Sequence, residues 1–306
     1  MTTLVFGHKS PDTDSTDSPI IWAWYLNQIA GVDAAPALLG EPNTEALFML
    51  DHWKLDKPQI ISDVEADQPV VIVDTNNPAE LPDNNNNADI KAIIDHHKLV
   101  GGLETKGPIH IVMEPLACTA TIMYKIIGDD MAQMPENIKG AMLTCILSDT
   151  LEFRSPTTTQ EDTAIAHALA KDLGIDIPDY AAKMFAAKSD VSSFSEAELL
   201  RMDSKEYEVG GKQFRVSVLE TTSPKTVLDR KDALMAAMPG VATEDGADQV
   251  LLFVVDILNE EATMLIPNDL TKSVAEKSFG ATVTGDTVVL PGVMSRKKQI
   301  IPNLKV

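Results

Sequence analysis

The first half of the chain alternates short apolar segments with longer segments of helical periodicity. Residues 4–7, 70–73 and 92–94 are short, apolar and rich in β-branched side chains, as is typical of strands buried on both faces. After the first of these we expect a helix with Ser18 as its N-cap and Pro19 in its first turn. Strands that alternate with helices predict an α/β fold with a mostly parallel sheet.

The second half also mixes both kinds of segment and predicts a smaller, mixed α/β domain. Its strand-like segments are residues 214–219, 251–257 and 263–266, and its helical segments are residues 226–237 and 269–278. A polar, serine-rich stretch precedes this half and predicts a linker. We therefore expect a first domain at residues 1–188, a hinge at residues 189–195 and a second domain at residues 196–306, with an active site in the cleft between the domains.

Composition narrows the possible functions. The 306 residues include 25 Lys and Arg against 46 Asp and Glu, a net charge of −21. Such a surface repels nucleic acids and anionic membranes, so we expect neither as a partner, and an anionic substrate would need a local group of cations. Cys118 and Cys145 are too few for a disulfide framework and are expected to be buried thiols. No segment has the pattern of a leader or a membrane span, so we expect a cytoplasmic protein.

Polar clusters follow the three predicted strands of the first half. His8, Asp12 and Asp14 lie in the loop after the first strand, Asp74 ends the second, and Asp95-His96-His97 ends the third. Ligand-binding groups gather at the carboxyl ends of parallel strands, so we expect these side chains at one edge of the sheet. Each cluster alone is also compatible with a solvated turn, and adjacent histidines of an extended chain point in opposite directions.

Asp149 is a further candidate because of its place in a helical pattern. It continues an apolar stripe with i, i+3, i+4, i+7, i+8 spacing, formed by Ile138, Ala141, Met142, Cys145 and Ile146. A carboxylate on a core-facing stripe needs a cation or a metal ion. The alternative is a helix that frays at Ser148 and leaves Asp149 in solvent.

Together these groups predict a metal centre. The candidate ligands are four carboxylates and two imidazoles: His8, Asp12, Asp14, Asp74, His96 and Asp149. This set is more than one divalent ion needs and suits two ions about 3.5–4 Å apart that share carboxylates. Mixed imidazole and carboxylate ligation favours Mn²⁺ over Mg²⁺, and the lack of thiolates disfavours structural zinc.

Three consecutive cations, Arg296, Lys297 and Lys298, stand out in the second half. Apolar residues on both sides predict a strand-like context for residues 295–299. The segment is compatible with a solvated surface, but Arg and Lys are also the side chains that bind phosphate oxygens. In the second case it would form an anion site that faces the metal centre.

The ordered set of motifs resembles the manganese-dependent, family II inorganic pyrophosphatases of the DHH phosphoesterase superfamily, over essentially the whole chain. The matching segments are residues 7–14, Asp74, residues 95–97, residues 148–149 and residues 295–299. The resemblance implies that the six candidate ligands bind metal, with Asp74 as the bridge, and that Asp95 supports the histidines. It also implies substrate binding by His97, Lys205, Arg296 and Lys297, and catalytic roles for Asp12, Asp14, Asp74 and His97.

The same resemblance implies a reaction and an assembly. Two Mn²⁺ or Co²⁺ ions per subunit would hold a bridging hydroxide that attacks pyrophosphate and yields two phosphates, with Mg²⁺ as an optional companion of the substrate. The subunit would form a homodimer through a sheet edge of the first domain. Thr75 departs from the pattern, since many relatives have a histidine after the bridging aspartate.

Two alternatives remain open at this stage. Other DHH proteins are phosphodiesterases that cleave oligoribonucleotides, or polyphosphatases, but the glycine-rich, histidine-ending motif of their second domain is not found here. A non-catalytic regulator that binds metal or phosphate on the same scaffold is the second alternative.

Overall fold

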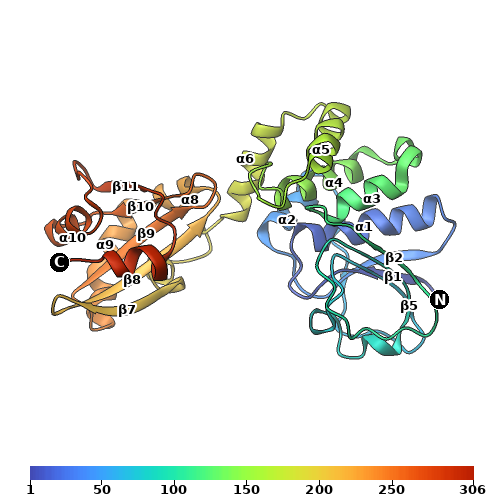
Figure 1. Ribbon diagram of the computed structural model, residues 1–306, viewed down its shortest axis with the longest axis horizontal. Helices are drawn as coiled ribbons and strands as arrows, with labels where there is room; N and C mark the ends of the chain where they lie inside the picture. The colour runs from blue at the N-terminus through green and yellow to red at the C-terminus, as the bar shows by residue number, and fades with distance from the viewer. The chain divides into compact units, whose positions relative to one another are not determined.

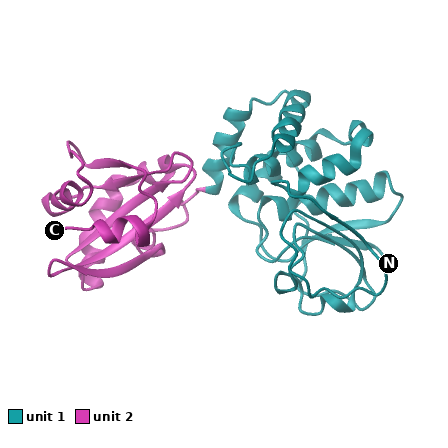
Figure 2. Cartoon of the chain, viewed as in Figure 1, with its two compact units in different colours: residues 1–188 teal, residues 189–306 magenta.

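The computed structural model describes residues 1–306 and divides into two compact units, residues 1–188 (unit 1) and residues 189–306 (unit 2) (Figure 2). Unit 1 has a six-stranded parallel sheet and unit 2 a five-stranded mixed sheet. The expected fold class is therefore confirmed. No helix is both long enough and apolar enough to span a bilayer.

The sheet of unit 1 has the order β3-β2-β1-β4-β5-β6, and every pair of neighbouring strands is parallel. Its strands are β1 (Thr3–Phe6), β2 (Ala34–Leu38), β3 (Gln59–Ile60), β4 (Pro69–Val73), β5 (Asp89–Asp95) and β6 (His110–Met113). The three strands predicted from apolar runs are β1, β4 and β5, which are neighbours at the centre of the sheet. Their carboxyl ends therefore meet at one edge.

Helices gather on one side of this sheet, while loops with short 3₁₀ turns cover the core on the other (Figure 1). The helices are α1 (Thr13–Gln28), α2 (Thr44–His52), α3 (Thr119–Ile127), α4 (Glu136–Asp149), α5 (Gln160–Leu173) and α6 (Ile177–Lys188). The 3₁₀ turns in these loops are η1 (Pro78–Glu80) and η2 (Asn85–Asn87), whereas a third, η3 (Gly128–Gln133), continues from α3. Both cysteines are buried free thiols, as expected.

The predicted start of the first helix is wrong. Helix α1 begins at Thr13 with Asp12 as its N-cap, and Pro19 lies inside the helix. The intervening residues 13–18 are polar, which is typical of a loop, but all of them are buried. Ser15 accepts from the His8 N–H and Ser18 donates to Asp14, whereas the hydroxyls of Thr13 and Thr16 are buried without a hydrogen-bond partner. The polar residues here therefore belong to the buried interior and not to a solvated turn.

Helix α4 runs through the interior of unit 1 and is buried from Gly140 to Ser148. A Cβ atom at Gly140 would lie 2.3 Å from the indole ring of Trp53. The indole N–H donates to Tyr180 Oη at 2.8 Å and to Thr144 Oγ1 at 3.1 Å. This close approach positions α4, which ends at Asp149.

The sheet of unit 2 has the order β11-β10-β9-β8-β7, and only β8 and β9 are parallel. Its strands are β7 (Ser204–Val209), β8 (Lys212–Thr221), β9 (Gln249–Asp256), β10 (Glu261–Leu265) and β11 (Thr287–Pro291). Its helices are α7 (Glu196–Met202), α8 (Pro224–Leu228), α9 (Lys231–Glu244), α10 (Asp269–Phe279) and α11 (Ile301–Asn303). The single helix predicted at residues 226–237 is thus two helices, α8 and α9.

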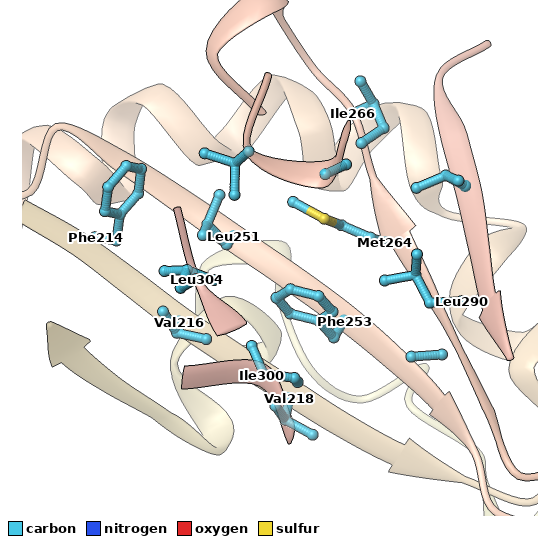
Figure 3. Close-up of a cluster of buried hydrophobic side chains, with 14 of the residues drawn as sticks. Phe214, Val216, Val218, Leu251, Phe253, Met264, Ile266, Leu290, Ile300 and Leu304 are labelled. Carbon is cyan, nitrogen blue, oxygen red and sulfur yellow. The ribbon is translucent and has the colours of Figure 1, made fainter. Parts of the chain in front are cut away.

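The C-terminal segment closes one core of unit 2. Figure 3 shows Ile300 and Leu304 beside Val216, Val218 and Phe253 of the sheet, and all five side chains are buried. The cations that precede Ile300 belong to a single π-helical turn, η4 (Arg296–Ile300), so the predicted strand-like context is wrong. The apolar residues around the cations fill a core from a helical turn, which a run of apolar residues alone cannot distinguish from a strand.

Residues 189–195 are attached to unit 2. Val191 is buried in the second core of that unit, and the Arg230 guanidinium donates to the carbonyls of Val191 and Phe194 at 2.8 Å each. Ser195 caps helix α7. The chain thus passes from one unit to the other at Lys188 and Ser189.

We predict that Gly140→Ala destabilises the protein by about 1–3 kcal/mol, because the added methyl group overlaps the Trp53 ring in a packed interior. The matched control is Gly240→Ala in α9, where a Cβ meets nothing within 4 Å and should stabilise the helix by about 0.5–1 kcal/mol. Denaturant unfolding of both variants measures the two effects. Equal stability of the two variants would contradict this account of the packing.

Candidate functional site

The loop after β1 is positioned by a contact between Gly7 and Ser15. A Cβ at Gly7 would lie 2.0 Å from Ser15 Oγ, so only glycine fits here. The close approach lets the backbone N–H of His8 donate to Ser15 Oγ at 2.7 Å. The first turn of α1 therefore sets the direction in which His8 leaves the strand.

Two carboxylates of this segment are held by backbone and hydroxyl donors. Asp12 Oδ1 accepts from the Ser15 N–H at 3.0 Å, as an N-cap does. Asp14 is buried, and its two oxygens accept from the Ser18 hydroxyl at 2.6 Å and from the Thr119 N–H at 2.7 Å. The bond to Thr119 connects the start of α1 to the start of α3.

Asp74 lies at the centre of the cluster. It follows β4 in the left-handed backbone region, with φ of +57°, which Asp tolerates better than most residues. Its N–H donates to the Ile94 carbonyl at 2.9 Å. The carboxylate is buried, with Oδ2 3.4 Å from His8 Nε2 and Oδ1 3.4 Å from His96 Nε2. Each oxygen of Asp74 therefore faces a different imidazole.

Both imidazoles have the orientation of metal ligands. Nδ1 of His8 donates to the Lys9 carbonyl at 2.7 Å, and Nδ1 of His96 donates to the Leu116 carbonyl at 3.1 Å. Because a carbonyl can only accept, each Nδ1 carries its proton and each Nε2 faces the carboxylates. This is the arrangement by which a backbone acceptor fixes the tautomer of a metal-binding histidine.

The expectation that His96 and His97 point in opposite directions is wrong. Their ring centroids lie 4.2 Å apart, and His97 Nδ1 is 3.8 Å from Asp74 Oδ1. Strand β5 ends at Asp95, so the two histidines lie beyond the extended backbone and the alternation of a strand does not apply to them.

Potential ligand atoms form three overlapping groups, each within 4.8 Å: Asp74, His96 and His97; His8, Asp12 and Asp74; and Asp14, His96 and Asp149. The structure thus brings together all six predicted ligands and His97 in unit 1. Asp149 is the last residue of α4, so the alternative of a helix that frays before it does not apply.

The closely spaced carboxylates of the cluster repel one another, and a bound cation would offset their charge. Burial raises the pKa values of Asp74 and Asp149, and the nearby charges of Asp14 and Asp12 raise them further. Burial lowers the pKa of His8, but contact with Asp12 and the charge of Asp74 outweigh burial and raise it to about 9. Asp149 Oδ2 is buried with no hydrogen-bond partner. Hard carboxylate oxygens with imidazole nitrogens suit Mn²⁺, so the residues present fit the metal.

Four polar side chains that support the ligands carry no clear sequence signal: Ser15, Ser18, Thr119 and Asn76. Ser15 lies in a polar segment typical of a loop, and Ser18 is predicted to cap the helix but donates to Asp14 from inside α1. Thr119 and Asn76 belong to no repeating pattern. Thr75 donates its hydroxyl to Glu80 Oε2 at 2.6 Å and so connects the Asp74 turn to η1.

The three cations predicted to bind substrate, Lys205, Arg296 and Lys297, line one cavity of about 680 Å³ in unit 2. The Arg296 guanidinium donates to the carbonyl of Asp203 at 2.8 Å and to its carboxylate at 2.7 Å, which fixes its orientation. The ammonium groups of Lys205 and Lys297 have no hydrogen-bond or ion-pair partner. The cavity therefore offers an anion the remaining N–H groups of an oriented guanidinium and two free ammonium groups, although Asp203 and Glu220 also line it.

Known proteins share both halves of this architecture. A Bacillus subtilis protein named manganese-dependent inorganic pyrophosphatase is 35% identical over 303 residues, which cover 98% of this chain and 97% of that protein. A Deinococcus radiodurans protein named a probable manganese-dependent inorganic pyrophosphatase is 39% identical over 307 residues, with the same coverage. The chain belongs to the manganese-dependent inorganic pyrophosphatase family. The resemblance found in the sequence is thus confirmed, and the protein is an enzyme of a hydrolase family.

Domain models and solved structures agree with membership of this pyrophosphatase family. The model of the DHH family N-terminal domain matches residues 2–149, and that of the DHHA2 domain matches residues 182–306. A Methanococcus jannaschii structure whose description reads "putative family II inorganic pyrophosphatase" is 31% identical with a TM-score of 0.61, covering 99% of this chain and 98% of that one. A Bacteroides fragilis protein described as exopolyphosphatase-related shares the fold, with a TM-score of 0.52 at 13% identity over 98% of this chain and 89% of that one.

We predict that Asp149→Asn makes the chelator-stripped protein more stable by about 1–2 kcal/mol at pH 7. Folding raises the pKa of the Asp149 carboxyl, so the ionised group destabilises the folded protein at pH values above its ordinary pKa. At lower pH the carboxyl is protonated in both the folded and the unfolded state. The stability gained by Asp149→Asn should therefore disappear below about pH 4. With added Mn²⁺ the parent protein should be more stable than Asp149→Asn, since the variant has lost a ligand oxygen.

Thermal melting with chelator and with Mn²⁺ measures both effects. The control is the exposed Glu65→Gln, which makes the same change in net charge and should leave the Mn²⁺-induced rise in Tm unaltered. If Asp149→Asn kept the full rise, Asp149 would not be a ligand.

Proposed function

We propose that this protein hydrolyses inorganic pyrophosphate to two phosphates at a dinuclear Mn²⁺ centre in unit 1. The observation that supports this most directly is the Asp74 carboxylate, whose two oxygens face His8 and His96 separately. A carboxylate placed in this way suits a bridge between two ions. His8 and Asp12 would complete one side, and His96, Asp14 and Asp149 the other. Co²⁺ accepts the same donor atoms.

The residues around the centre prepare it for an anionic substrate. When bound, the metal ions would supply Lewis acidity that activates water and offsets phosphate charge. Ser18, Thr119 and the backbone acceptors of the histidines hold the ligand atoms in place before any ion arrives. The ligands therefore need little rearrangement, which favours tight binding.

We propose that the cationic cavity of unit 2 binds phosphate oxygens. In a chain with a net charge of −21, Lys205, Arg296 and Lys297 form a local reversal of sign. Arg296 is held by Asp203, so its fork would lose little freedom on binding, while the two lysines can follow the charge as it shifts between phosphates. Mg²⁺ could enter as the counterion of pyrophosphate. Because ligands and cations belong to different units, activity would require both.

His97 is the proposed hydrogen-bond donor or acceptor for the substrate. Its side chain is half exposed, and its Nδ1 is 2.9 Å from Asp95 Oδ1, which leaves Nε2 available. A ring held in this way can contact a phosphate oxygen and supply or take a proton there. Asp12, Asp14 and Asp74 would act as the catalytic carboxylates that hold the reacting centre.

The decisive assay is phosphate release from pyrophosphate by chelator-stripped protein, with Mg²⁺ alone and after incubation with Mn²⁺. We expect rapid release that depends on Mn²⁺, because the imidazole and carboxylate donor set favours that ion. Activity on oligoribonucleotides or polyphosphate in place of pyrophosphate would overturn the proposal, as would silence on all three substrates.

The control for the role of unit 2 is a pair of adjacent lysines. Lys297→Ala should lower kcat/KM for pyrophosphate by about 10²-fold, since it removes a charge from the cavity. Lys298→Ala changes an exposed lysine that does not line the cavity and should stay within about 2-fold of the parent. An equal loss in both variants would mean that general charge, and not the cavity, is responsible.

We further propose a homodimer formed through β6. This strand is an edge of the sheet, pairing only with β5, and its Ile111 side chain is 56% exposed. Beside it lies an apolar groove of about 510 Å³ lined by Trp22, Tyr25 and Val112. An unpaired strand edge next to an apolar groove can pair with a strand of a second subunit.

Light scattering of the parent protein should give twice the chain mass. Ile111→Lys places a charge on the exposed edge and should give the mass of the monomer. A monomeric parent would refute the proposal.

A further inference from the structure

Asn76 lies two residues after Asp74 and is 3% exposed. Its amide group makes three hydrogen bonds. Nδ2 donates to Asp95 Oδ2 at 2.6 Å and to the Lys98 carbonyl at 3.0 Å, and Oδ1 accepts from the Val100 N–H at 2.7 Å. Only one orientation of the amide satisfies all three partners, because two are acceptors and one is a donor.

The bond from Asn76 occupies one oxygen of the Asp95 carboxylate and leaves the other oxygen to His97. Asp95 is fully buried, and its Oδ2 is taken by Asn76. The other oxygen, Oδ1, accepts from the His97 backbone N–H at 3.0 Å and from His97 Nδ1 at 2.9 Å. With the carboxylate fixed from one side, its second oxygen holds the proton of the imidazole on Nδ1 and leaves Nε2 free.

The other two bonds fix the chain that follows His97. The Lys98 carbonyl and the Val100 N–H both bind the Asn76 amide, although Leu99 and Val100 have exposed side chains with little packing of their own. The His97 side chain is itself 51% exposed. Apart from the contact with the His96 ring, whose centroid is 4.2 Å away, packing contributes little to the position of the His97 ring, so hydrogen bonds have to fix its orientation.

We propose that Asn76 is a positioning residue for the reaction, which acts through Asp95 to set the tautomer and orientation of His97. The inference rests on the proposed function, in which His97 meets the substrate. The Asn76 side chain makes no hydrogen bond to a predicted metal ligand and does not line the cavity of unit 2. Its effect on pyrophosphate should accordingly pass through His97.

A double-mutant cycle tests this route. We expect Asn76→Ala to lower kcat/KM for pyrophosphate by about 10–100-fold, the usual effect of losing a group that orients a functional side chain. In the His97→Ala background the same change should cost less than about 3-fold, because the side chain that it positions is gone. Losses that multiply in the double variant would overturn the proposal. Asn77→Ala, which removes the cap of η1 next door, is the matched control and should stay within about 2-fold.

A second variant covers the case in which Asn76→Ala fails to fold, as judged by circular dichroism. Asn76→Asp keeps the shape and the acceptor for Val100 but loses the donor to Asp95 and faces it with a second carboxylate. Asn76→Asp should lower kcat/KM strongly in the parent protein and only weakly in the His97→Ala background. If it retained full activity, the bond to Asp95 would have no part in positioning His97.

The imidazole spectrum provides a readout that does not depend on activity. In the full chain loaded with diamagnetic Mg²⁺, ¹⁵N correlation spectra, assigned by comparison with His97→Ala, should show His97 with its proton on Nδ1. In Asn76→Asp the ring should lose this fixed tautomer; an unchanged spectrum would contradict the inference. If the parent protein fails to hydrolyse pyrophosphate, the proposed function is wrong, and the spectrum still decides the role of Asn76.

Discussion

Repulsion among buried carboxylates is the constraint on which the rest of unit 1 depends. Asp14 and Asp74 are buried, Asp149 has an oxygen with no partner, and Asp12 adds a fourth negative charge at the same sheet edge. The same repulsion and burial raise the pKa of Asp74, and the neighbouring carboxylates raise the pKa of His8. Divalent ions offset this negative charge, so the arrangement that destabilises the metal-free protein is the one that binds metal.

The fold assembles this charge from distant parts of the sequence. Strands β1, β4 and β5 are neighbours, so the residues that follow them meet at one edge, and α4 brings Asp149 to the same place. Neighbouring polar groups then hold several of the ligands: Ser15 positions the backbone of His8, and the Thr119 N–H donates to Asp14. Unit 2, taken by itself, carries a group of cations on a helical turn anchored by Ile300.

Much of this architecture follows from the pattern of residues. Short apolar runs indicate the central strands because parallel strands are buried on both faces, and the apolar stripe of α4 leads to Asp149. The start of α1 could not be predicted, because its polar residues are buried although polar residues are usually exposed. The turn at Arg296 could not be predicted either, because the apolar residues around it belong to a helical turn and not to a strand. Asn76 was missed because its role depends on three contacts with the Asp95 loop, 19–24 residues along the chain.

The central claim is that the carboxylate cluster holds two ions through Asp74, and the number of bound ions tests it most directly. Chelator-stripped protein would be equilibrated with Mn²⁺ by dialysis, and bound metal measured per chain. The account predicts about two ions per chain, of which Asp74→Asn would retain at most one. A parent protein that binds a single ion, or an Asp74→Asn variant that keeps both, would contradict it.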